Sequence, residues 1–156
     1  MNERIKILIR WWKIKGQQEN DDPFVKFFFF YVCFDAWITA ESDGDRNGDK
    51  LNSFINGSSC LKESSEDFLR SPQAQSLLTD LKQLSPIKDM RPNRRGAHKE
   101  LKDIHRLEEV VYFIYQIRNN LFHGSKSPMD SRDVELVDLA GRLLEQWTTW
   151  AYDKCL

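Results

Sequence analysis

The sequence predicts an all-α protein, an up-and-down bundle of four to five main helices in a single domain spanning residues 1–156. Four segments carry apolar residues at helical spacing or are apolar throughout, namely 4–15, 23–41, about 99–122 and about 131–153. No segment shows the strict alternation of a half-buried strand. The prolines lie at the edges of these segments or between them. A chain of 156 residues suits one domain with a sizeable core.

The first two helices differ in the surface that they are expected to bury. Residues 4–15 mix basic and apolar residues, whereas 23–41 is apolar on nearly every side, which predicts burial all round. Asp22 suits the N-cap of the second helix, and the proline after it suits the first helical position. Only eight residues separate Lys26 from Asp35, far fewer than the ~20 that cross a bilayer. We therefore expect a core helix and no membrane partner.

The middle of the chain is polar and rich in helix breakers. Residues 50–55 suggest a short helix, and about 56–98 reads as a polar, partly helical insertion, with weak helices near 65–70 and 73–84. A long helix is then expected from about 99 to 122, ending at Gly124, and Asp130 or Ser131 is expected to cap the last one.

Arg118 is the residue that departs from the pattern of its helix. It shares a strip roughly 80° wide with four apolar residues, Leu107, Val111, Ile114 and Leu121. A buried guanidinium without a partner costs several kcal/mol, so an anion should face it. Asp35 on the apolar helix, with Tyr31 and Thr39 on the same polar line, could form an internal salt bridge with it. A bound phosphate is the functional alternative.

His123 follows Arg118 by five residues and directly precedes Gly124. On an ideal helix the two side chains would point ~140° apart. An unwound last turn at the glycine would bring the imidazole toward the same cleft. The alternative is a solvent-facing histidine that interacts with the helix dipole.

The string YQIRNNLFHGSKSP resembles the signature of the HEPN superfamily, in which an arginine and a polar residue precede a histidine. Arg118, Asn119 and His123 match these positions. The segments FFFFYVCFDAWITAES and GDKLNSFI resemble the first helix pair of plasmid-borne and defence-associated members, and LFHGSKSPMDSRDVELVDLAGRLL resembles their motif end and final helix. The matching segments cover roughly half of the chain.

This resemblance implies a HEPN-like bundle that dimerises and cleaves RNA without a metal or cofactor. Arg118 would bind the phosphate, and His123 would act as general base or acid. Asn119 could orient the histidine or hold a phosphate oxygen, Asn120 is a weaker candidate for that role, and Asp35 would position Arg118.

The expected partners are RNA, a second copy of the chain and, for a toxin or defence effector, an antitoxin protein. Members that are paired with a nucleotidyltransferase antitoxin often carry a modified tyrosine two residues after the histidine. Ser125 occupies that position here, which argues against such regulation.

The alternative function is a non-catalytic helical module that binds RNA or protein, with Arg118 as a buried brace.

A basic segment precedes the motif helix, which is the helix expected at about 99–122 that carries Arg118. Residues 88–102 hold six basic and two acidic residues, a net charge of +4 in a chain of net charge −1. Arg91, Arg94 and Arg95 would follow an RNA backbone, and Lys126 is a further phosphate ligand. A solvated loop explains the same segment equally well.

Metal sites are weakly indicated. Residues 43–49 fit the first half of a calcium-binding loop, but Phe54 stands at position 12, where the bidentate glutamate is needed, which favours a solvated turn. His98 and His105 do not form an i,i+4 pair, so we expect no zinc site.

The number and positions of the cysteines indicate the redox state of the cellular compartment. Cys33, Cys60 and Cys155 lie far apart, are odd in number and fall in apolar or terminal segments. These features predict reduced thiols and a cytoplasmic protein.

Overall fold

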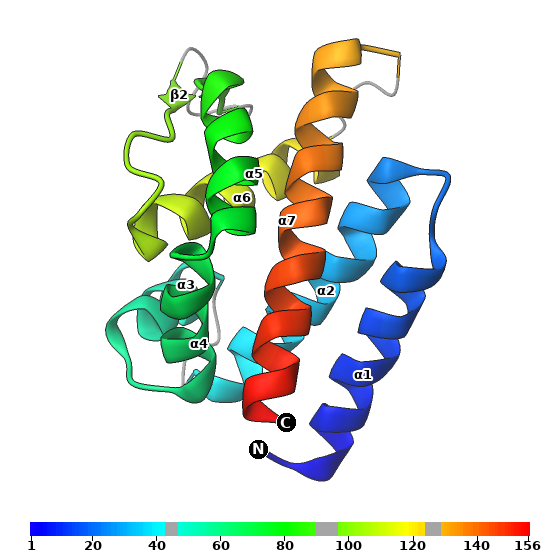
Figure 1. Ribbon diagram of the computed structural model, residues 1–156, viewed down its shortest axis with the longest axis vertical. Helices are drawn as coiled ribbons and strands as arrows, with labels where there is room; N and C mark the ends of the chain where they lie inside the picture. The colour runs from blue at the N-terminus through cyan, green and yellow to red at the C-terminus, as the bar shows by residue number, and fades with distance from the viewer. Residues whose placement is uncertain (43–46, 90–96, 124–128) are drawn as a thin grey trace.

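The structure is a computed structural model that describes residues 1–42, 47–89, 97–123 and 129–156. Within these ranges the chain forms seven helices and one two-stranded sheet (Figure 1). The elements in chain order are α1 (Glu3–Gln18), α2 (Pro23–Glu41), α3 (Asn47–Asn56), α4 (Cys60–Leu69), α5 (Pro72–Gln83), β1 (Ile87–Lys88), β2 (His98–Lys99), α6 (Leu107–Phe122) and α7 (Ser131–Cys155). The all-α prediction is confirmed in its coarse form.

The starts of α2 and α7 were predicted correctly, because each helix has an aspartate at its N-cap. The Asp22 carboxylate accepts hydrogen bonds from the backbone N–H groups of Phe24 and Val25, and α2 spans the predicted 23–41. The Asp130 carboxylate likewise accepts from the N–H of Asp133 at the start of α7. Each cap satisfies N–H groups that lack a partner within the helix.

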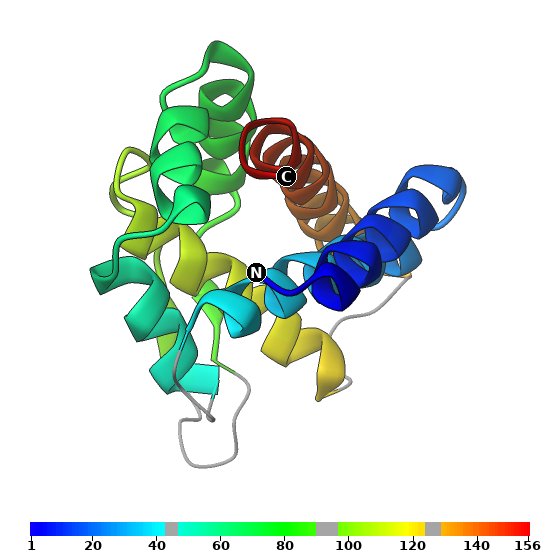
Figure 2. The same cartoon turned by 90° about the horizontal axis from the view of Figure 1, so that it is seen from below.

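Helix α7 organises the bundle. It packs against α1 and α2 and also against α4 and α5. In Figure 2 it lies between α1 on one side and α4 and α5 on the other. The largest fully buried side chains include Trp37 of α2 and Trp147 of α7, and the Trp147 ring lies 4.8 Å from that of Phe34.

Among the described residues, α2 is the one helix that is long and apolar enough, by length and composition, to cross a membrane. Seven of its residues are buried in the bundle, where it packs against α1 and α7. Both of its predicted interrupting charges are paired. The ammonium of Lys26 lies 2.6 Å from the Glu145 carboxylate, and Asp35 pairs with Lys50.

The middle segment contributes more to the core than its polar composition suggested. The two predicted weak helices are α4 and α5, and both pack on α7. Leu61, Phe68 and Leu78 are at most 1% exposed. The indole N–H of Trp147 donates to the Ser65 hydroxyl at 2.6 Å, which satisfies two buried polar groups.

The start of the motif helix was predicted wrongly. Helix α6 begins at Leu107 rather than near residue 99, because His98–Lys99 pairs with Ile87–Lys88 as an antiparallel two-stranded sheet. Between the strand and the helix, the Asp103 carboxylate accepts a hydrogen bond from the His105 N–H and forms a turn. Two-residue strands are too short to show an alternating pattern, so the sequence could not reveal them.

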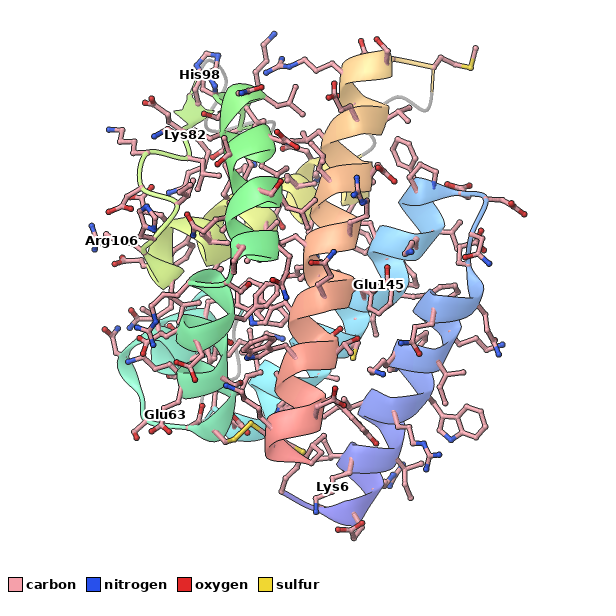
Figure 3. The ribbon with its side chains drawn as sticks, viewed as in Figure 1. Lys6, Glu63, Lys82, His98, Arg106 and Glu145 are labelled. Carbon is pink, nitrogen blue, oxygen red and sulfur yellow. A yellow bond between two sulfur atoms is a disulfide. The ribbon has the colours of Figure 1, made fainter. Side chains whose placement is uncertain are left out.

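The expectation of three reduced cysteines is wrong for two of them. Cys60 at the start of α4 forms a disulfide with Cys155 at the end of α7, seen as a yellow bond in Figure 3. The two residues are 95 positions apart, and only the packing of α4 on α7 brings them together. Cys33 is free and fully buried. Its burial raises the pKa of the thiol to about 12.

The disulfide and the buried free thiol predict the outcome of a thiol titration at pH 8. The native, unreduced protein should show no rapidly reacting thiol, because Cys33 is shielded and almost entirely protonated. Unfolding without a reductant should expose one thiol per chain, and unfolding after reduction should expose three. Three thiols in the unfolded, unreduced sample would contradict the disulfide.

Candidate functional site

Arg118 lies on α6 among aromatic rings and is half-buried. Its guanidinium carbon is 4.3 Å from the ring centroid of Phe122 and 5.9 Å from that of Tyr31. Its Nη1 donates to the Asn119 side-chain oxygen at 3.0 Å. Its Nε is buried and has no hydrogen-bond partner among the described residues. The guanidinium is therefore held mainly by contacts with ring faces.

Asp35 does not provide the partner that was expected for Arg118. Its carboxylate forms an ion pair with Lys50 of α3 at 2.9 Å, and the same ammonium also contacts the Thr39 hydroxyl at 3.0 Å. No ion pair joins Asp35 to Arg118 in the part of the chain that the structure describes. The expected positioning role of Asp35 is thus corrected to an ion pair that links α2 to α3.

Tyr31 lies close enough to Asp35 and Arg118 for both charges to affect the pKa of its hydroxyl. Burial raises the pKa of its hydroxyl far above the usual value, the negative charge of Asp35 raises it further, and Arg118 opposes this rise. The phenol therefore stays protonated and can donate a hydrogen bond at any physiological pH. Tyr31 was noticed in the sequence only as part of a polar line, without a role.

The two asparagines that follow Arg118 are both buried and have different partners. Asn119 is 7% exposed and contacts Arg118 through its side-chain oxygen. Asn120 is 1% exposed, accepts from the Gln116 amide at 2.9 Å and donates to the carbonyl of Lys88 at 2.7 Å. Asn120 therefore joins α6 to β1, while Asn119 remains beside the guanidinium.

His123 is the C-cap of α6 and its side chain is exposed. Its backbone N–H still donates to the Asn119 carbonyl at 3.0 Å, but its ψ of 7° departs from the helical value. The chain thus leaves the helix at this residue, and Gly124 lies outside the described residues. Among those that are described, no hydrogen bond joins the imidazole to Arg118.

A small apolar cavity opens beside the guanidinium, between α2 and the end of α6. Its volume is about 170 Å³, and its lining residues are Phe24, Phe27, Phe28, Tyr31, Leu121 and Phe122. Two of these, Tyr31 and Phe122, are the residues whose rings contact Arg118. The cavity and the guanidinium therefore share two aromatic side chains.

The basic segment begins next to the motif helix. The Lys88 carbonyl accepts the hydrogen bond from Asn120, two residues after Arg118, and the Lys99 ammonium lies 5.7 Å from the ring centroid of Tyr112 on α6. The four cationic residues that were expected to contact RNA, Arg91, Arg94, Arg95 and Lys126, lie outside the described residues.

The described residues contain no cluster of side chains that could hold a metal ion. His98 is on β2 (Figure 3), and His105 is exposed in the segment before α6. No group of three or more histidine, cysteine or acidic side chains with metal-binding geometry occurs in residues 1–42, 47–89, 97–123 and 129–156. Residues 43–46 of the calcium-like segment lie outside these ranges.

Within the described residues, the site thus contains a half-buried guanidinium without a carboxylate partner, a neutral phenol, an amide and an aromatic cavity. The exposed imidazole of His123 follows at the end of the same helix. The guanidinium and the aromatic cavity together can bind an anion attached to a flat ring. Compared with family models, with curated proteins and with solved structures, the chain has no match.

Proposed function

We propose that this chain is a metal-independent endoribonuclease of the HEPN type. In this proposal it acts as a homodimer, cleaves RNA in the cytoplasm and serves as a toxin or defence effector that an antitoxin protein could control. The observation that carries the proposal is the state of Arg118. Its guanidinium is half-buried and has no carboxylate partner among the described residues, because Asp35 pairs with Lys50.

A guanidinium in this environment is suited to phosphate. Partial burial strengthens its attraction for an anion, and its planar donors match phosphate oxygens in pairs. The rings of Tyr31 and Phe122 limit its orientation. The Asn119 amide beside it could supply a further hydrogen bond to phosphate. Arg91, Arg94, Arg95 and Lys126 would then bind neighbouring phosphates of the RNA backbone.

The chemistry follows from an imidazole that exchanges protons near neutral pH. His123 would remove the proton of a ribose 2′-hydroxyl, whose oxygen attacks the adjacent phosphorus. The bond from phosphorus to the 5′-oxygen then breaks, and this oxygen receives a proton from a second acid or from water. The products are a 2′,3′-cyclic phosphate and a 5′-hydroxyl, and Arg118 stabilises the charge on the phosphate.

The homodimer is part of the proposal because one chain does not join its own two motif side chains by a hydrogen bond in the described residues. Two copies facing each other would place the His123 of one chain beside the Arg118 of the other. The disulfide does not support the cytoplasmic location, since such bonds are uncommon in reducing compartments.

The test is incubation of the purified protein with a single-stranded RNA in EDTA, followed by analysis of the new ends. We expect cyclic-phosphate and 5′-hydroxyl ends, no cleavage of the DNA of the same sequence, and a mass by light scattering of twice 18.5 kDa. Equal cleavage by wild type and by Arg118→Ala would exclude the site. Binding of RNA without cleavage would favour the non-catalytic module instead.

A further inference from the structure

The aromatic cavity between α2 and α6 is the feature that the chemistry above leaves unused. Five of its six lining residues are aromatic. Phe27 and Tyr31 are buried beneath it, while Phe28 and Phe122 are 40% and 55% exposed at its rim. The rim rings are 6.1 Å apart and meet edge to face. Exposed aromatic side chains around a cavity are typical of a binding site.

We propose that this cavity holds one unpaired nucleobase of the RNA whose phosphate binds Arg118. The inference rests on the proposed function and adds the substrate class, single-stranded RNA with a base that can leave its stack. Phe28 and Phe122 would be the stacking residues, and Arg118 would hold the phosphate of the same or the adjacent nucleotide.

The size of the cavity agrees with a single ring system. A cavity of about 150 Å³ with apolar walls admits benzene, so the 170 Å³ here suits one flat base that projects partly into solvent, and it is too small for a base pair. Bases in a duplex are stacked and paired, so only an unpaired one could enter.

The position of Arg118 favours a nucleotide over an apolar segment of another protein. The guanidinium lies 4.3 Å from the Phe122 ring at the rim of the cavity and has no carboxylate among the described residues. An apolar occupant would bury this charge further without an anion to pair with it, which is costly. A nucleotide brings a flat apolar ring for the cavity and a phosphate for the arginine.

The test uses a single-stranded DNA oligonucleotide that carries one 2-aminopurine, which has no 2′-hydroxyl at any position and so cannot be cleaved by the proposed reaction. Binding is followed by the fluorescence of the modified base, which changes when the base stacks on a ring. Phe28→Ala should weaken binding by about 5- to 150-fold, the range expected for the loss of one base–aromatic stack. Phe122→Leu, which keeps an apolar side chain beside Arg118, should have a smaller effect in the same direction.

The matched control is Trp11→Ala. Trp11 is an aromatic residue of α1 that is 59% exposed and does not line the cavity. Its removal should change the affinity by less than about twofold. An equal loss in this variant would mean that aromatic surfaces bind the oligonucleotide without a defined site, which would overturn the proposal.

The outcomes separate this inference from the proposed function. If the wild type binds the oligonucleotide through Phe28 but cleaves no RNA, the nuclease proposal fails and the base site stands. If RNA is cleaved but Phe28→Ala binds like the wild type, the base site is wrong. Undetectable binding by the wild type, or equal affinity for duplex DNA, would also overturn it. Conversion of a dimer to a monomer by Phe28→Ala, with affinity unchanged, would assign the cavity to a second copy of the chain.

Discussion

His123→Ala should lower the rate of RNA cleavage by about 10²- to 10⁴-fold at neutral pH, the usual contribution of a general acid or base. The fold should not change, because the imidazole is exposed and makes no hydrogen bond with the described residues; the backbone bond to the Asn119 carbonyl does not depend on the side chain. Single-turnover cleavage with enzyme in excess, together with circular dichroism and the melting temperature, measures both effects.

The control for this substitution is His105→Ala. His105 is also exposed, and it precedes α6 rather than ending it. We expect its replacement to leave the cleavage rate within about twofold of the wild type. A loss of activity that is the same in both variants, or no loss in His123→Ala, would remove His123 from the proposed reaction.

Replacing both cysteines of the disulfide, as Cys60→Ser with Cys155→Ser, should lower the free energy of unfolding by about 2–5 kcal/mol. The cross-link joins residues 95 positions apart and therefore restricts the unfolded chain strongly. Cys60 is exposed, so a serine there buries no new polar group. Against a typical total of about 5–15 kcal/mol, the loss is large. Urea denaturation of the unreduced proteins measures it.

Reduction provides an independent check on the same cross-link. A reductant should destabilise the wild type by about as much as the double substitution does, and it should leave the double variant unchanged. A wild type whose denaturation midpoint does not respond to the reductant would show that the cross-link contributes nothing to stability.

The parts of the fold that could be predicted depend on neighbours in the sequence. Asp22 and Asp130 cap helices by contacting N–H groups two or three residues ahead, and these starts were correct. The placement of α4 and α5 in the core was not apparent, because their short apolar faces pack mainly against α7, which is far away in the sequence. The disulfide from Cys60 to Cys155 likewise depends on that packing.

For the candidate site too, features set by local sequence could be predicted and contacts between distant helices could not. The unusual position of Arg118 was visible from helical spacing, but the identity of its neighbours was not. The Asp35 carboxylate was expected to face it and instead meets Lys50, because α3 packs against α2. The contact between Phe28 and Phe122 also crosses between two helices that are far apart in the sequence, so no local pattern could indicate the cavity.

The bond from Cys60 to Cys155 encloses α4, α5, α6 and α7 in one covalent ring, and leaves α1, α2 and α3 outside it. A mechanical force applied to the two chain ends would pass through this bond and bypass the ring. The chain could then lengthen only to roughly 200 Å, against roughly 500 Å without the bond, at about 3.4 Å per residue. The motif helix, inside the ring, would carry none of the tension along its backbone, whereas α2, which supplies Phe28 and Tyr31, would carry all of it.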